Sequence, residues 1–396
     1  MNRSTVHPSA GVLPLVLALL SLLAPWPSFA KCAVGQGPGA TVLYPYFEVD
    51  LGNPGGLTTL ISLNNESSLP RLSRLVVWTD WAIPALSFDV YLAGRDVQTI
   101  NLRDVLSGVL PSTGAGANLT GFANCAAQPP FHSNPALAPL QIELLRNDLT
   151  GKGVFSCAGE PHGDQRARGF ITVDVVQRCS GVTNADLSLT PAGGLTYFTN
   201  IASSTNVLWG DLLLVDPTEN FAQGIEAVSI VADPALLGDN SNTFYGNYVG
   251  WSGEDRRSPL PPIWATRYLD GGVFTGGTDL LVYRAAGAST SRRPCNDHPS
   301  WYPLVARGIT GRDEDTNPVL ALSNSTELPL ATQRVSVADL GSGPTAPFGR
   351  LQLDLTQNEN KPRGAWVIPV LSASGKFSVG MNAAPVVDGC GLDPFP

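Results

Sequence analysis

The stretches at residues 41–50, 58–64 and 72–80 read TVLYPYFEVD, TTLISLN and LSRLVVWTD, and they decide the fold. Each is short, rich in β-branched and aromatic residues, and bounded by Gly, Pro, Asn or Asp, which is typical of β-strands. They follow one another through short polar turns, so they predict three successive strands.

The same pattern recurs along the rest of the chain, and 41 Gly and 33 Pro supply frequent turns. Further strands are predicted at Ser87–Leu92, Val97–Leu102, Gly169–Val176, Leu212–Asp216, Ala227–Val231, Asp279–Tyr283, Arg334–Ala338, Arg350–Leu355 and Ala365–Leu371. Helical periodicity is confined to Pro139–Asn147, where proline suits the first helical position, and to a turn at Leu102–Leu106. The sequence therefore predicts an all-β protein.

Three segments share a pattern of strand ending in Asn, Ser-rich turn, and strand ending in Asp. They run from Thr59 to Asp80, from Thr196 to Asp216 and from Val319 to Asp339, with Asn-to-Asp distances of 16, 16 and 15 residues. A repeat of this kind predicts tandem immunoglobulin-like or fibronectin-like β-sandwich units at residues 31–165, 166–300 and 301–396. Two large sandwich domains or one continuous double sheet remain open, because any all-β chain offers strand, turn and strand at this length.

The first 30 residues have the three parts of a signal peptide. Arg3 precedes the apolar run Val12–Ala24, prolines follow, and Ala30 ends a small-residue cleavage motif. The run is shorter than the roughly 20 residues that a spanning helix needs, and no second long apolar run follows it. We therefore expect a secreted, periplasmic or cell-surface protein with no transmembrane segment after cleavage. Lys31, directly before Cys32, argues against lipid attachment.

Six cysteines follow the predicted signal peptide, an even number that suits disulfides in an oxidising compartment. They are Cys32, Cys125, Cys157, Cys179, Cys295 and Cys390. Six cysteines allow 15 pairings. The sequence favours Cys125 with Cys157, because the two bracket one polar, proline-containing insertion. No Cys-x-x-Cys occurs, and only His298 lies near a cysteine, so a zinc site is disfavoured.

Several segments resemble a family of secreted bacterial proteins to which no activity is assigned. The resemblance rests on Tyr44–Asp50, Trp78–Trp81, Asp89–Leu92, Val97–Val105 and Gly163–Cys179, about half of the chain. It implies a bacterial envelope or extracellular setting. It implies no catalytic residue, cofactor or partner.

Catalytic motifs are scarce. Gly250–Glu254 approaches the nucleophile elbow Gly-x-Ser-x-Gly but ends in Glu254. Among the histidines His132, His162 and His298, His162 is the best candidate base, because Asp164 or Glu160 could orient its imidazole. A solvated loop histidine is the competing interpretation.

Two groups of side chains are candidate ligand sites. Trp78, Asp80 and Trp81, and the later Tyr248 and Trp251, combine aromatic rings with carboxylates, as sugar-binding surfaces do, although buried core aromatics explain the same residues. By strand alternation, one of Trp78 and Trp81 is expected in the core.

The segment Asp313-Glu314-Asp315-Thr316-Asn317 places oxygen ligands at alternate positions, as calcium loops do. Pro318 and Asn324 break the EF-hand pattern, so calcium ligation by Asp313, Asp315 and Asn317 competes with an ordinary acidic turn. No other cofactor is expected.

The charge balance narrows the range of partners. The chain has 24 Lys and Arg against 33 Asp and Glu, a net charge of −9, which disfavours nucleic acid. The sequence favours a non-enzymatic binding or structural protein whose partner is a surface polymer or an envelope protein. The alternative is a secreted hydrolase acting on polysaccharide or peptide.

Overall fold

The computed structural model describes residues 37–131, 133, 136–152, 158–183, 189–236, 243–246, 255–287, 297–356 and 364–386. The predicted signal peptide at 1–30 lies outside this part of the chain. So do His132, Tyr248, Trp251 and four of the six cysteines, Cys32, Cys157, Cys295 and Cys390.

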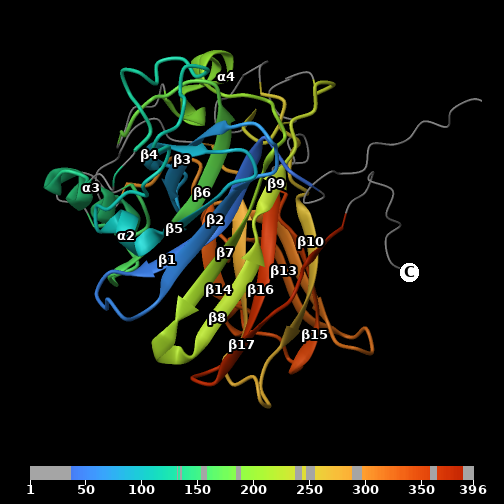
Figure 1. The fold of residues 1–396 in the computed structure, drawn as a ribbon. Coiled ribbons are helices and arrows are strands. Elements are labelled where there is room, and N and C mark those ends of the chain that lie inside the picture. Colours follow the sequence, from blue (N-terminus) through green and yellow to red (C-terminus); the bar gives the residue numbers. More distant parts are fainter. Residues whose placement is uncertain are drawn as a thin grey trace, which may run out of the picture.

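The described chain is mostly β-structure in four antiparallel sheets, which confirms the all-β prediction (Figure 1). Sheet A has the order β4-β3-β6-β1-β9, and sheet B has the order β5-β2-β7-β8. The strands of sheet A are β1 (Thr41–Asp50), β3 (Arg71–Thr79), β4 (Pro84–Leu92), β6 (Arg166–Val176) and β9 (Val228–Ile230). Those of sheet B are β2 (Thr58–Asn65), β5 (Val97–Asn101), β7 (Leu208–Asp216) and β8 (Phe221–Glu226).

The other two sheets come from the C-terminal part of the chain. Sheet C has the order β14-β11-β16-β17, and sheet D has the order β13-β12-β15-β10-β18. The strands of sheet C are β11 (Gly277–Arg284), β14 (Thr332–Ser336), β16 (Ala365–Ala373) and β17 (Phe377–Gly380). Those of sheet D are β10 (Ile263–Leu269), β12 (Ala306–Arg312), β13 (Pro318–Ser325), β15 (Phe348–Asp354) and β18 (Ala384–Pro385).

Within the described residues, three short α-helices accompany the sheets. They are α2 (Leu102–Leu106), α3 (Pro139–Thr150) and α4 (Leu195–Asn200). The first two confirm the helical predictions, with Pro at the start of α3 and Gly151 in the left-handed conformation at its end. Helix α4 was predicted as a strand because Thr, Tyr and Phe favour strands. Tertiary contacts override that preference: the rings of Tyr197 and Phe198 are buried.

An apolar core lies between each pair of packed sheets. Sheet A packs on sheet B through side chains such as Val42, Leu75 and Leu212. Sheet C packs on sheet D through Leu280, Val282 and their neighbours. Alternation along β11 sends Leu281 to the other side of sheet C, into the core of sheets A and B. Sheet C therefore joins the two halves of the chain into one packed body.

Strand pairing does not follow the predicted unit boundaries. β6 begins at Arg166 yet pairs with both β1 and β3, so the strands on either side of 165/166 share sheet A. Likewise β11 pairs with β14 and β16, across the boundary at 300/301. The predicted repeat also loses its middle copy, because Thr196–Asn200 lies in a helix. The repeat was traced along the sequence, whereas the sheets pair strands that lie far apart in it.

A β-bulge in β1 sets the direction of the second half of this strand. The register with β6 shifts between Tyr44 and Phe47, around Pro45, which has no amide hydrogen for the ladder. The freed carbonyl oxygen of Pro45 accepts a hydrogen bond of 2.6 Å from the hydroxyl of Thr332. This contact ties β1 to β14 next to a charged cleft.

Candidate functional site: a charged cleft between the sheets

A cleft of about 410 Å³ opens where sheets A, B and C meet. Strands β1 and β6 form one wall, β11 and β14 a second, and the turns after β7 and β16 the third. Its lining residues are Tyr46, Glu48, Leu57, His162, Arg166, Arg168, Asp216, Glu219, Phe221, Asp279, Thr332, Gln333, Arg334, Ser372, Ala373, Ser374, Gly375 and Phe377. Ligand sites commonly lie in such a concavity between packed units.

Glu48 lies at the centre of the charged groups, with only 2% of its side chain exposed. Its Oε1 accepts hydrogen bonds from Arg166 Nη1 at 3.1 Å and Arg168 Nη2 at 3.2 Å. Its Oε2 accepts one from the hydroxyl of Tyr46 at 2.8 Å, and Arg334 Nη1 lies 3.9 Å away. We call these five residues the Glu48 cluster.

Strand geometry explains how the Glu48 cluster forms. Glu48 and Arg168 are register partners on β1 and β6, and Tyr46 and Arg166 lie two residues from them, on the same faces. Arg334 reaches the cluster from β14 in another sheet. Sequence reasoning missed these residues, although a lone Glu in the apolar strand 41–50 and the alternation of Arg166 with Arg168 were usable signals.

Two further carboxylates hold the arginines in place. Asp164 accepts hydrogen bonds from Arg168 Nη1 at 3.0 Å and Nη2 at 2.7 Å, and Asp279 accepts from Arg334 Nε at 2.7 Å. Burial acts to raise the pKa of Asp164, but the hydrogen bonds from Arg168 and from the Arg166 backbone outweigh it and lower that pKa below its usual value. Burial raises the pKa of Tyr46 well above its usual value, and the charge of Glu48 adds to the effect. Asp164 is therefore charged near neutral pH, and Tyr46 is neutral.

His162 lines the cleft but does not pair with Asp164, its predicted partner. Its Nε2 lies 2.9 Å from Oδ2 of Asp80, which is 3% exposed and also accepts a hydrogen bond from the Glu160 amide at 3.0 Å. Asp164 is instead committed to Arg168. The structure thus joins two residues, His162 and Asp80, that the sequence analysis had named for different reasons.

Two of the tryptophans proposed for sugar binding, Trp78 and Trp81, are buried. Trp78 is fully buried, stacks on Phe170 with ring centroids 5.7 Å apart, and donates its indole N–H to Thr172 at 2.9 Å. Trp81 is 2% exposed and packs near Tyr302. Strand alternation was expected to place one of the two in the core, but both are buried. Trp78 lies on β3, whose residues 72–79 are all buried, and Trp81 lies in the turn before β4, in the same apolar cluster.

The acidic segment 313–317 forms the turn between β12 and β13. Asp313 accepts hydrogen bonds from the Asn317 amide at 2.7 Å and its side-chain nitrogen at 2.9 Å. These bonds lower the pKa of Asp313. The turn thus satisfies its own carboxylate, and the described residues hold no group of three or more His, Cys, Asp or Glu placed to bind a metal ion. Calcium ligation by Asp313, Asp315 and Asn317 stays a prediction.

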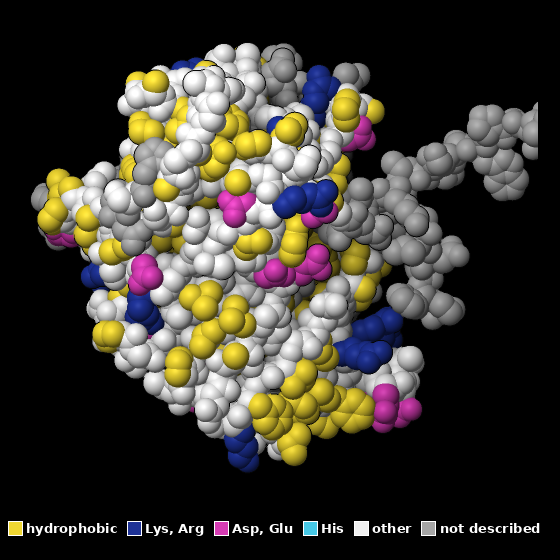
Figure 2. Space-filling view, in the orientation of Figure 1, with side chains coloured by type: hydrophobic (Ala, Val, Ile, Leu, Met, Phe, Trp, Pro, Cys, Tyr) yellow, Lys and Arg dark blue, Asp and Glu magenta, His cyan; other side chains and the backbone are white. Residues whose placement is uncertain are grey.

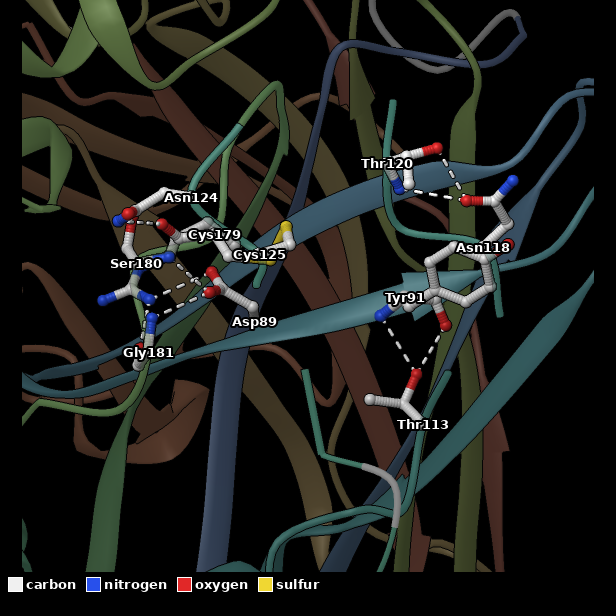
Figure 3. The surroundings of a disulfide bond; sticks show 11 residues. Asp89, Tyr91, Thr113, Asn118, Thr120, Asn124, Cys125, Cys179, Ser180 and Gly181 are labelled. Atoms are coloured by element: carbon white, nitrogen blue, oxygen red, sulfur yellow. Dashed lines mark hydrogen bonds and ion pairs between the residues drawn. A yellow bond between two sulfur atoms is a disulfide. The ribbon is translucent and has the colours of Figure 1, made fainter. Parts of the chain in front are cut away.

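One disulfide lies within the described residues, and it joins Cys125 to Cys179 (Figure 3). The predicted pairing of Cys125 with Cys157 is therefore wrong. The loop carrying Cys125 runs along the segment after β6, where the Cys179 amide donates to the Ala123 carbonyl at 3.0 Å. That contact between distant segments was not visible in the sequence spacing.

The disulfide lies beside a buried ion pair (Figure 3). Asp89 accepts hydrogen bonds from the amides of Ser180 at 2.7 Å and Gly181 at 2.9 Å, and Arg74 Nη1 lies 3.0 Å from its other oxygen. These contacts hold the segment that follows β6 against sheet A, on the face opposite to the one that packs on sheet B. They have a structural role and do not reach the cleft.

The molecular surface agrees with the charge balance of the sequence. On the face shown in Figure 2, Lys and Arg side chains are scattered in small groups. A nucleic-acid-binding surface would favour a continuous band of such side chains. Among the described residues, no helix has the length and apolarity to cross a bilayer. A scan of protein-family models, a search of curated proteins and a search of solved structures each returned no match.

Proposed function

We propose that the chain is a non-enzymatic binding protein of the secreted or cell-envelope compartment, and that its cleft holds a sugar of a surface polymer. The predicted signal peptide at residues 1–30 and the Cys125–Cys179 disulfide support the compartment. An immunoglobulin-like or fibronectin-like arrangement of tandem units stays a prediction.

The Glu48 cluster is the observation that carries the proposal. Its guanidinium groups are held in fixed positions by Glu48, Asp164 and Asp279, so their remaining N–H groups need little reordering to meet a ligand. Arg166 has 39% of its side chain exposed and uses only Nη1 on Glu48 among the described residues. Paired carboxylates and arginines offer both acceptors and donors, which suits a ligand with many hydroxyl groups.

Aromatic rings supply the apolar part of the site. Phe221 lies under the Arg334 guanidinium at 5.6 Å, and Phe377, 43% exposed, borders the cleft. Phe377 also meets Phe274 edge to face, with ring centroids 6.0 Å apart. A sugar ring can place its C–H face on Phe377 while its hydroxyl groups reach Arg166.

The test uses the full chain on a glycan array, followed by calorimetry with the sugars that bind. We expect Arg166→Gln and Phe377→Ala each to weaken binding by about tenfold or more, equivalent to about 1.4 kcal/mol. The matched control is Arg95→Gln, an exposed arginine paired with Glu66 outside the cleft, which should bind as the parent does. Absence of glycan binding, or equal affinity of the cleft variants and the control, would overturn the proposal.

The His162–Asp80 pair favours a second candidate, a hydrolase acting on polysaccharide or peptide. An imidazole held by a buried carboxylate is the base part of a nucleophilic triad. Here Asp80 is the partner of Nε2, and none of the described Ser, Thr or Cys side chains hydrogen-bonds to His162. Turnover of a glycan or peptide panel, abolished by His162→Ala, would establish the hydrolase. Binding without turnover would exclude it for that panel.

A further inference from the structure

A second concavity of about 590 Å³ lies between the edges of sheets B and C, next to the charged cleft: its lining residues Ala222 and Ser378 directly follow Phe221 and Phe377 of the cleft. Strand β8 ends sheet B, β17 ends sheet C, and Figure 1 shows β8 beside β16 and β17. The concavity is lined by residues 222–228 of the β8 segment, 366–368 of β16, and 378 and 380–383 of the β17 segment. We call it the edge slot.

Hydrogen bonds of the Ser378 side chain close one end of the edge slot. Its hydroxyl accepts a hydrogen bond from the Ala222 amide at 3.2 Å and donates one to the Ala222 carbonyl at 2.8 Å. The two strands are therefore bridged by a side chain and form no ladder with each other. Beyond this bridge the chains separate, because β17 ends at Gly380 and the chain continues to β18 in sheet D.

The bridge also shows which backbone groups face the edge slot. Ala222 points its amide and carbonyl away from β7, so by strand alternation Gly224 and Glu226 do the same. On the opposite side, Pro369 accepts from the Met381 amide at 3.5 Å, so Val367, two residues earlier, points its N–H and C=O towards the same edge. Within the described residues, no strand pairs with β8 or with residues 366–368 on this side.

We propose that the edge slot binds an extended peptide of a partner protein, which adds a strand between β8 and β16. The N–H groups of Gly224 and Glu226 and the C=O of Glu226 face the slot on one side, and the N–H and C=O of Val367 face it on the other, so one extended chain can pair with both, as in β-augmentation. The C=O of Gly224 already accepts a hydrogen bond of 3.2 Å from the Gln223 side chain. Glu226 is exposed and is the one charged side chain lining the slot, so it favours a basic residue in the peptide. Gly224 has no side chain to obstruct the approach of another backbone.

The first experiment selects peptides from a random 12-residue display library on the full chain. Each selected peptide is then N-methylated one residue at a time. Successive N–H groups of a strand inserted between two edges point alternately to β8 and to β16, so we expect affinity losses at consecutive residues of the bound segment and none at its unpaired ends. Uniform tolerance of N-methylation, or a library that yields no binder, would overturn the proposal.

Two variants at one position test the location. Gly224→Pro removes the N–H that faces the edge slot while keeping the ladder with β7, because that amide does not pair with β7. Gly224→Ala keeps the N–H, and its added methyl would meet nothing closer than Leu213 Cδ1 at 3.9 Å. We expect about a tenfold loss of peptide affinity for Gly224→Pro and none for Gly224→Ala.

Hydrogen exchange gives an independent readout that does not depend on the proline variant. The amides of Gly224, Glu226 and Val367 should gain protection when the peptide binds, and glycan binding in the charged cleft should be unchanged in Gly224→Pro. Protection elsewhere overturns the proposal. A peptide-independent dimer dissociated by Gly224→Pro would also overturn it, in favour of a second copy as the occupant.

Discussion

The same two strands, β1 and β6, carry an arginine–carboxylate cluster at each end, and the two clusters differ in exposure. At one end Glu48 faces Arg168 beside the cleft, and at the other Thr41 faces Asp174. Around Asp174 lie Arg257, Asp255, Tyr197 and Tyr245, which we call, with Asp174, the Asp174 cluster.

The Asp174 cluster is sealed from solvent. Arg257 is 1% exposed, and Asp174 and Asp255 are fully buried. Asp174 accepts hydrogen bonds from the hydroxyls of Tyr197 at 2.6 Å and Tyr245 at 3.1 Å, and Arg257 also contacts Thr41. In the Glu48 cluster, by contrast, the exposed fractions of Arg166, Arg168 and Arg334 are 39%, 16% and 28%.

This difference in exposure distinguishes a structural role, for the Asp174 cluster, from a binding role, for the Glu48 cluster. The N–H and O–H groups of the Asp174 cluster donate hydrogen bonds to acceptors within the protein, and these bonds hold residues 255–257 against sheet A. The partly exposed arginines of the Glu48 cluster keep N–H groups for a ligand. The same chemistry therefore serves stability where water is excluded and recognition where water can enter.

The largest effect is expected from a substitution that removes the cation of the solvent-excluded Asp174 cluster. Arg257→Met leaves Asp174 and Asp255 as buried carboxylates without a cation, which should lower the free energy of unfolding by about 3–5 kcal/mol. Arg166→Met is the counterpart in the cleft, and it should cost less than about 1 kcal/mol because solvent reaches the side chain. Urea unfolding of both variants measures the difference. Equal losses would contradict the distinction between the clusters.

A matched tyrosine pair sharpens the comparison. Tyr197→Phe removes a hydrogen bond to buried Asp174 and should cost about 1.5–3 kcal/mol of unfolding free energy. Tyr46→Phe removes the bond to Glu48, but Arg334 Nη1, 3.9 Å away, can move closer to the freed oxygen, so we expect about 1 kcal/mol. Chemical denaturation of the two single variants gives both values. A larger loss for Tyr46→Phe would reverse the assignment.

The strands were predictable from the sequence because their cause is local. The expected strand Thr41–Asp50 matches β1, and the expected helix at Pro139–Asn147 lies within α3. Sheet membership was not predictable. β2 and β3 follow one another in sequence but lie in sheets B and A, and each has one partner strand more than 80 residues away, β7 for β2 and β6 for β3.

The cleft was only partly predictable. His162 and Asp164 were named, and both lie at or next to the cleft, but their partners Asp80 and Arg168 depend on the folded structure. Arg334 gave no local signal, because its neighbours Glu48 and Asp279 belong to other strands. Long-range pairing is what the sequence patterns do not encode.

The smallest expected effect concerns acid stability at the cleft. Because the folded state lowers the pKa of Asp164 below 3.8, its carboxylate stabilises the fold above about pH 4, and this contribution is lost as the pH falls through the folded-state pKa. Asp164→Asn should therefore lower stability at pH 6 and bring it closer to that of the parent chain near pH 2. The side chain is 41% exposed, so we expect less than about 1 kcal/mol.

Urea unfolding at several pH values measures this effect, with the exposed Asp315→Asn as a control outside the cleft. A stability difference between Asp164→Asn and the parent that stays constant from pH 6 to pH 2 would show that the Arg168 pair does not depend on the charge of Asp164. Packing, and not the charge of Asp164, would then hold Arg168 in the Glu48 cluster, and the contrast between the two ends of β1 and β6 would lose its electrostatic basis.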